Sequence, residues 1–113
     1  MVKKYYVPER GDLVWVDFSP QRGHEQGGER PAVVISQRIY NERSGLTLVC
    51  PVTSKDKGYP FEVTIQEGKI NGFVLSDQVR SIDWKARRVR FISKMDLRTL
   101  KEISEKIVSL IMG

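Results

Sequence analysis

The chain has 113 residues, of which 19 are basic and 14 acidic, so its formal net charge is +5 at pH 7. A chain of this length is expected to fold as one domain, residues 1–113, and to bury roughly two thirds of its unfolded surface without metal or disulfide staples. The single cysteine, Cys50, excludes an internal disulfide and the usual zinc spacings, and it suits a reducing cytoplasm. Because no apolar run approaches the roughly 20 residues that span a bilayer or resembles a signal peptide, we expect a soluble, unexported protein.

Short apolar segments that alternate with polar residues and are separated by turn residues fill the first four fifths of the chain, and this pattern predicts β-strands. The predicted strands are Asp12–Phe18, Ala32–Ser36, Leu46–Thr53, Glu62–Ile65, Gly72–Leu75, Val79–Ile82 and Arg88–Ile92. Ser44-Gly45 and Asn71-Gly72 predict turns, and the second predicts a hairpin because both residues tolerate a positive φ. The expected fold is mainly β, a small barrel.

The end of the chain changes to a helical period. Ser93 and Asp96 resemble a capping box, and apolar residues then recur at helical spacing opposite charged ones. These apolar residues are Leu97, Leu100, Ile103, Ile107, Leu110 and Ile111. We therefore expect one amphipathic C-terminal helix that closes the barrel, with an apolar stripe that packs in the core; the alternative is a face that binds a partner.

The segment from Gly23 to Pro31 indicates a functional site. It places His24, Glu25 and Arg30 among three glycines, directly before an apolar strand. A glycine backbone can bend close to a ligand, whereas a plain linker needs only turn formers. Pro31 favours an extended conformation at Arg30, which holds the guanidinium at the edge of the predicted sheet.

Two later strands also end in polar side chains. One delivers Thr53-Ser54 and the basic loop with Lys55 and Lys57, and the other delivers Ser76-Asp77-Gln78. Further basic residues gather toward the C-terminal part: Arg80, Lys85, Arg87, Arg88 and Arg90. This clustering indicates a polyanion or an acidic peptide as partner, although the last three arginines alternate with apolar residues and could equally form the solvent face of a strand.

Taken together, the segments GDLVWVDFSP, GHEQGGERPAVVIS, CPVTSKDKGYPFEV and LSDQVRSIDW resemble the MazF/PemK family of ribonuclease toxins from bacterial toxin–antitoxin pairs. They occur in the family's order and cover nearly the whole chain. The resemblance implies an SH3-like barrel of the MazF/PemK/CcdB type and a homodimer. It also implies a sequence-specific endoribonuclease that needs no metal or other cofactor, cuts single-stranded messenger RNA, inhibits translation and growth, and is blocked by a cognate antitoxin with an acidic disordered segment.

RNA cleavage without a metal requires a base for the ribose 2′-OH proton, a cation for the phosphorane charge, a hydrogen-bond donor to the phosphate and an acid for the leaving 5′ oxygen. Arg30 can hold phosphate oxygens bidentately, and Thr53 offers a hydroxyl donor. The resemblance implies that these two form the catalytic pair. It also matches Glu25 to the family's glutamate, the candidate general base. His24 suits acid–base work, but a relative has serine there, so we expect a substrate contact or a bystander.

The remaining candidates are expected to contact RNA. Single-stranded RNA is recognised by stacking on aromatic rings and by hydrogen bonds to base edges. The residues of these types near the predicted groove are Phe18, Lys57, Asp77 and Gln78, with Tyr59 equally suited to packing. The loop from Thr53 to Phe61 is similar to that of a family member that reads ACA, so ACA is the first recognition sequence to test.

Three other interpretations stay open from the residues alone. Arg30 and Glu25 could form a surface ion pair, while Thr53 caps a turn. A CcdB-like gyrase inhibitor would use a tryptophan beside the chain end, where this sequence has Leu110 to Gly113. A barrel that binds RNA without cutting it would carry the same basic surface.

Overall fold

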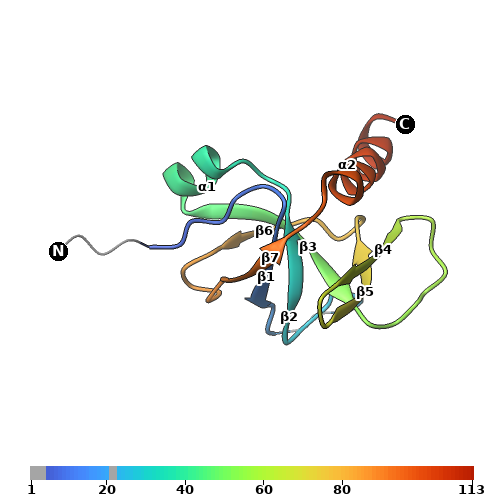
Figure 1. Ribbon diagram of the computed structural model, residues 1–113, viewed down its shortest axis with the longest axis horizontal. Helices are drawn as coiled ribbons and strands as arrows, with labels where there is room; N and C mark the ends of the chain where they lie inside the picture. The colour runs from blue at the N-terminus through green and yellow to red at the C-terminus, as the bar shows by residue number, and fades with distance from the viewer. Residues whose placement is uncertain (1–4, 21–22) are drawn as a thin grey trace.

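The computed structural model describes residues 5–20 and 23–113. Its elements are β1 (Asp12–Asp17), β2 (Glu29–Val34), α1 (Arg38–Ser44), β3 (Leu46–Thr53), β4 (Glu62–Glu67), β5 (Ile70–Leu75), β6 (Arg80–Asp83), β7 (Arg90–Lys94) and α2 (Leu97–Met112). The described residues before β1 and helix α1 lie at one end of the molecule, and the β4–β5 pair lies at the opposite end (Figure 1). Within the described ranges, no helix is long and apolar enough to cross a membrane.

The seven strands form one antiparallel sheet in the order β4-β5-β3-β2-β1-β7, with β6 paired to β3 off this path. β3 is central to the sheet because it pairs with three other strands. Leu46 to Val49 pair with β6, while Val52 and Thr53 pair with β5. The other edge of the strand, from Val49 to Pro51, pairs with β2. This half-barrel with a C-terminal helix confirms the predicted fold class.

The sheet is buried on both faces by two apolar clusters. Leu13 of β1 lies in one cluster with Val33 and with Ile103 of α2. The next residue, Val14, lies in the other cluster, which also contains Phe18. Because successive strand residues point to opposite faces, the run of apolar residues in β1 fills both clusters at once.

The predicted hairpin turn at Asn71-Gly72 is wrong. Gly68, with φ of +57°, lies in the turn between β4 and β5, whereas Asn71 and Gly72 lie within β5. A Cβ at position 72 would lie 2.5 Å from the carbonyl oxygen of Thr53. Glycine is therefore required here for the close approach of two strands, and its turn propensity is irrelevant.

The helix boundaries also differ from the sequence prediction. Ser93 belongs to β7, and its buried hydroxyl has no hydrogen-bond partner among the residues that the structure describes. The N-cap of α2 is Asp96, whose carboxylate accepts a hydrogen bond from the Thr99 amide at 2.6 Å and whose pKa is lowered by that bond. The short helix α1 was not predicted; it ends at Gly45, which adopts the left-handed conformation with φ of +76°.

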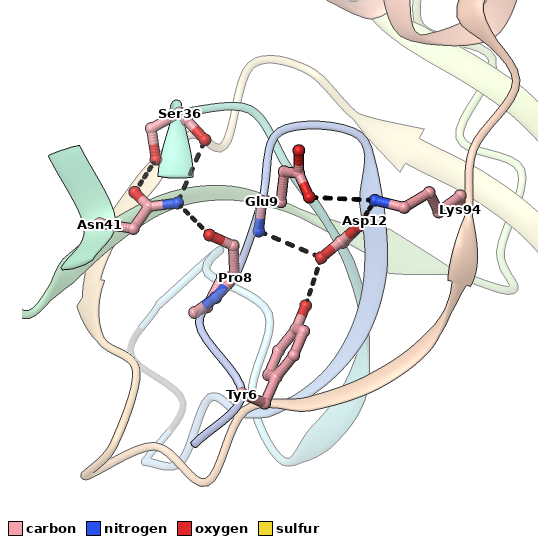
Figure 2. Close-up of polar contacts among 7 residues, drawn as sticks. All are labelled: Tyr6, Pro8, Glu9, Asp12, Ser36, Asn41 and Lys94. Atoms are coloured by element: carbon pink, nitrogen blue, oxygen red, sulfur yellow. Dashed lines mark hydrogen bonds and ion pairs between the residues drawn. The ribbon is translucent and has the colours of Figure 1, made fainter. Parts of the chain in front are cut away.

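Two sets of hydrogen bonds, centred on the buried residues Asp12 and Asn41, attach the segment from Tyr6 to Glu9 to the barrel (Figure 2). We call the first the Asp12 cluster: Tyr6, Glu9, Asp12 and Lys94. The Asp12 carboxylate is only 1% exposed and accepts hydrogen bonds from the Tyr6 hydroxyl at 2.5 Å, the Glu9 amide at 3.1 Å and Lys94 Nζ at 2.9 Å. Burial, together with the bond to Asp12, raises the pKa of Tyr6. The hydrogen bond to Asp12 raises the pKa of Lys94.

The second group centres on Asn41 of α1, which is fully buried. Its Nδ2 donates to the Pro8 carbonyl at 2.8 Å and to the Ser36 carbonyl at 3.1 Å, while its Oδ1 accepts from the Ser36 hydroxyl. Trp84 Nε1 donates to the Asn41 carbonyl at 2.8 Å. Since the side-chain amide and the backbone of Asn41 are both hydrogen-bonded, this group is structural.

Candidate active site

Arg30 lies near the start of β2, where its backbone pairs with Val16 of β1. Its Nε donates a hydrogen bond to the Gly27 carbonyl at 2.9 Å, which orients the guanidinium toward the preceding loop. In the described part of the chain, no carboxylate lies within ion-pair distance of this guanidinium. Partial burial lowers the pKa of Arg30, although an arginine stays charged at any working pH. The result is a half-buried cation that has no counter-ion among the described residues.

Thr53 is the last residue of β3 and is 4% exposed. Its hydroxyl oxygen accepts a hydrogen bond from the Lys55 amide at 3.2 Å. A threonine hydroxyl has one donor hydrogen and two acceptor lone pairs, so the hydrogen is still available for a ligand. On the other side, the strand is held by β5, where Thr53 pairs with Phe73 and Gly72 leaves room for the Thr53 carbonyl.

One pocket of about 360 Å³ brings these strand ends together. Its lining residues come from β2, β3 and two loops: Gly23, His24, Gln26, Arg30, Thr53, Ser54, Lys55 and Lys57. Four of them are basic and none is acidic. We call it the Arg30 pocket. A pocket with this lining attracts an anion and can bond its oxygens through the guanidinium and the hydroxyl, which is the chemistry that a phosphodiester requires.

Gln78 holds the loop that carries His24. Its side-chain Oε1 accepts from the Gln26 amide at 3.3 Å, and its Nε2 donates to the His24 carbonyl at 3.4 Å. At the base of the same loop, the Phe18 amide donates to the Gly28 carbonyl at 2.8 Å. Here Gln78 bonds the backbone of the loop, so a contact between this amide and a base would replace one of these bonds.

The loop that carries Lys57 is held by Glu62. The carboxylate of Glu62 accepts hydrogen bonds from the Lys57 amide at 3.1 and 3.2 Å and from the Tyr59 amide at 2.9 Å. Ser76 donates its amide to the Phe61 carbonyl at the end of this loop. These bonds fix the backbone while the Lys57 side chain remains exposed.

The predicted catalytic and binding residues are only partly brought together. His24, Arg30, Thr53 and Lys57 line one pocket, as the sequence led us to expect. Glu25 lies between His24 and Gln26 on the loop that lines the pocket, but its exposed side chain is not part of the lining and forms no ion pair with Arg30 among the described residues. The alternative interpretation of these two residues as a surface salt bridge therefore does not hold.

Asp77 is exposed and lies beyond the pocket lining. Its negative charge nevertheless affects a buried group, the Cys50 thiol. Burial and, to a lesser degree, the Asp77 charge raise the pKa of Cys50 to about 12. Cys50 is therefore a protonated, buried thiol, as its place in an apolar strand indicated.

Phe18 has a different place from the one expected. Its side chain is fully buried in the second core cluster, so in this structure it offers no face on which a base could stack. The guanidinium of Arg80 lies 5.2 Å from the ring centroid and covers it. The prediction failed because an aromatic residue at a strand end suits both core packing and base stacking, and only the tertiary fold separates the two.

The C-terminal arginines are largely engaged by the protein itself. Arg90 forms an ion pair with Glu29, and Arg87 donates to the backbone carbonyls of Asp17 and Ser19. Only Arg90 of this run belongs to a strand, because β7 begins there, whereas Arg87 and Arg88 lie in the turn before it. The alternative of a solvent-facing strand therefore holds for Arg90 alone. Ser54 and Gly72 were not predicted as site residues; the position of Ser54 next to Thr53 was the available signal, whereas nothing local marks Gly72.

Within the described residues, no group of three or more His, Cys, Asp or Glu side chains is arranged to hold a metal ion.

Comparison with known proteins places this chain in a family context. Residues 9–111 match the model of the family described as PemK-like, MazF-like toxin of type II toxin-antitoxin system. The chain is 54% identical over 82 residues to the endoribonuclease toxin MazF of Escherichia coli strain K12. The matched region covers 73% of this chain and 74% of that protein. It is 43% identical over 98 residues to the endoribonuclease toxin ChpB of the same strain, covering 81% and 83% of the two chains.

Solved structures give the same result. The crystal structure of MazF (Form-I) from Deinococcus radiodurans matches with a TM-score of 0.91 and 48% identity, over 96% of this chain and 100% of that one. The crystal structure of MazE-MazF (Form-II) from the same organism matches with a TM-score of 0.84 and 43% identity, over 96% and 98%.

Proposed function

Since the chain belongs to the family of PemK-like, MazF-like toxins of type II toxin–antitoxin systems, we propose that it is an endoribonuclease that cuts single-stranded RNA at the Arg30 pocket. The family membership agrees with the resemblance read from the four sequence segments. The observation that carries the assignment to this pocket is a half-buried guanidinium that has no counter-ion in the part of the chain that the structure describes and that lines the same pocket as the Thr53 hydroxyl. An unneutralised cation in a partly desolvated place is poised for an anionic ligand.

In the proposed mechanism the substrate supplies the nucleophile. The ribose 2′-OH attacks the adjacent phosphorus, the bond to the 5′ oxygen of the next nucleotide breaks, that oxygen takes up a proton from water, and the products are a 2′,3′-cyclic phosphate and a 5′-OH. Arg30 stabilises the charge that develops on the phosphate oxygens, and Thr53 donates a hydrogen bond to one of them. Glu25, on the loop beside the pocket, takes the 2′-OH proton.

A rotation of the exposed Glu25 side chain toward the pocket is compatible with this role, because catalytic hydrogen bonds often form only with substrate bound. His24 and Lys57 contact the RNA backbone or bases from the pocket wall. Asp77 and Gln78 read a base at its edge, with Gln78 exchanging its bonds to the loop for bonds to RNA. ACA is the first recognition sequence to test.

Two partners complete the proposal. The toxin acts in the cytoplasm as a homodimer, and exposed apolar side chains on the last turns of α2, among them Val108, Ile111 and Met112, supply a surface for a second copy. A cognate antitoxin covers the Arg30 pocket with an acidic segment that orders as it binds and pairs its carboxylates with the basic lining. Inhibition by the antitoxin then weakens as the salt concentration rises.

A direct test is incubation of the purified chain with a long single-stranded RNA in excess EDTA, followed by gel electrophoresis and sequencing of the new 5′ ends. We expect discrete fragments that share a short sequence at their ends, no fragments from DNA, and no cutting once the antitoxin is added. RNA that binds but stays intact would instead identify a non-cleaving RNA-binding barrel. Inhibition of DNA gyrase without RNA cutting would identify a CcdB-like function.

A further inference from the structure

A second pocket adjoins the Arg30 pocket. It has a volume of about 290 Å³ and is lined by Arg30, Pro31, Val52, Thr53, Ser54, Lys69, Ile70 and Asn71. Arg30, Thr53 and Ser54 line both pockets. The proposed catalytic pair therefore lies between two hollows, and a phosphodiester bound by this pair would have one on each side. We call the second hollow the Asn71 pocket.

The lining of the Asn71 pocket fits a nucleotide. Pro31, Val52 and Ile70 provide an apolar surface against which a base can pack. Lys69 in the β4–β5 turn and Asn71 in β5 are both exposed, and neither side chain forms a hydrogen bond or ion pair with another residue in the part of the chain that the structure describes. A carboxamide presents two donor hydrogens and a carbonyl acceptor, which is the combination that recognises a base edge.

The direction of the RNA chain follows from the proposed chemistry. The attacking 2′-OH belongs to the nucleotide on the 5′ side of the scissile phosphate, and its proton goes to Glu25 on the loop beside the Arg30 pocket. The 5′ ribose must therefore lie on that side of Arg30 and Thr53. The nucleotide whose 5′ oxygen leaves then lies on the other side, where the Asn71 pocket is.

We propose that the Asn71 pocket binds the first nucleotide after the cut, with Asn71 reading its base and Lys69 contacting a phosphate. This inference rests on the proposed function, because it requires that cutting occurs between Arg30 and Thr53. It assigns sequence selection to the β4–β5 hairpin, in addition to the two loops around the Arg30 pocket. The hairpin is well suited to this role, since Asn71 is fixed by pairing with Gln66 of β4.

The test is cleavage of a randomised single-stranded RNA pool, with the 5′ ends of the fragments sequenced to give the base preference at each position. For Asn71→Ala we expect the preference at the first position after the cut to fall about tenfold, the scale of one base contact, while other positions are unchanged. Asn71→Asp keeps the acceptor and removes the donor, so the preferred base at that position should change to one that donates. Gln37→Ala removes an exposed amide at the opposite end of the molecule and serves as the matched control.

For Lys69→Ala we expect a higher KM and an unchanged kcat. The slope of the logarithm of the RNA-binding constant against the logarithm of the salt concentration should fall by about the share of one phosphate contact. Lys101→Ala on α2, where the side chain is 80% exposed, is the control for the lost charge. Thermal unfolding of each variant shows whether it is folded, and Asn71→Asp preserves side-chain size if Asn71→Ala is unstable.

An unaltered preference at every position, or a loss confined to the nucleotide before the cut, would overturn the assignment. If the wild type cuts RNA and Thr53→Ala does not, such a result rejects only the Asn71 pocket. If Thr53→Ala cuts as fast as the wild type, the proposed function itself fails.

Discussion

Two polar clusters of the molecule, the Asp12 cluster and the Arg30 pocket, are built in opposite ways. In the Asp12 cluster a carboxylate that is 1% exposed receives three hydrogen bonds, one of them from a lysine. In the Arg30 pocket a half-buried guanidinium has a single bond to a carbonyl and four basic residues share the lining without an acid. The first cluster is internally satisfied, so it stabilises the fold. The second has no counter-charge within residues 5–20 and 23–113, so it is prepared for a ligand.

This difference separates two properties that one substitution could otherwise confuse. A change in the Asp12 cluster should alter stability and leave the chemistry of folded molecules intact, whereas a change at the Arg30 pocket should do the reverse. The following variants test that separation.

Arg30→Ala should have the largest effect. We expect cutting to slow by about a hundredfold or more, the usual consequence of removing a group that stabilises charge in the transition state. Arg30→Lys should recover little, because an ammonium cannot bond two phosphate oxygens in the same planar geometry. Single-turnover rates on a short RNA, with thermal unfolding as the control for folding, give the comparison. A retained rate in Arg30→Ala would remove the pocket from the mechanism.

Asp12→Ala should act on stability. It leaves the Tyr6 hydroxyl and the Glu9 amide without their acceptor, so we expect the free energy of unfolding in urea to fall by about 2–3 kcal/mol. Asp12→Asn keeps the size of the side chain and removes its charge. Cutting per folded molecule should stay within about twofold of wild type. A large loss of rate at unchanged stability would contradict the separation of the two clusters.

The same cluster predicts a pH dependence. The pKa values of Tyr6 and Lys94 are both raised in the folded state from ordinary values of 10.0 and 10.5. A raised folded pKa contributes stability that is present below the unfolded pKa and is lost as the pH rises through the folded one. The wild type should therefore lose stability above about pH 10 more steeply than Asp12→Asn, in urea unfolding measured across that range. Equal slopes would show that Asp12 does not couple to these groups.

Gly72→Ala should connect the fold to the chemistry. A methyl group 2.5 Å from the Thr53 carbonyl oxygen cannot be accommodated without a shift of the β3 end, so kcat should fall about tenfold. If the effect acts through Thr53, Gly72→Ala should change kcat little when it is added to Thr53→Ala. A loss of stability caused by Gly72→Ala would persist in that double variant. An equal drop in both backgrounds would mean that Gly72 does not position Thr53.

Among the changes at the pocket, His24→Ser should have the smallest effect on the rate, below about tenfold, because His24 lines the pocket while the loop is held through its backbone carbonyl. Gln78 still bonds that carbonyl in the variant. Initial rates between pH 5 and 8 give the comparison. A loss as deep as that of Arg30→Ala, with one limb of the pH profile removed, would assign an acid or base role to His24.

The sequence predicted the elements whose signals are local. Alternation located the strands to within a few residues, and the resemblance to the MazF/PemK family paired Arg30 with Thr53. What failed depends on contacts far along the chain. Asn71-Gly72 has the composition of a turn, but the carbonyl of Thr53 decides its place in β5. An aromatic side chain such as Phe18 suits both a core and an RNA-binding surface, so its sequence position alone does not distinguish them. Helix α1 is held by hydrogen bonds of Asn41, a polar residue that leaves no apolar periodicity in the sequence.

The account depends most directly on the claim that the substrate provides the nucleophile at the Arg30 pocket. The measurement is mass spectrometry of fragments from a short RNA that contains the recognition sequence, compared with the same RNA carrying a single 2′-deoxy sugar just 5′ of the cut. We predict a 2′,3′-cyclic phosphate and a 5′-OH from the unmodified RNA, and no cutting at that position in the modified one. A 5′-phosphate product, or cutting that survives the deoxy substitution, would show that water attacks the phosphate and would contradict the mechanism.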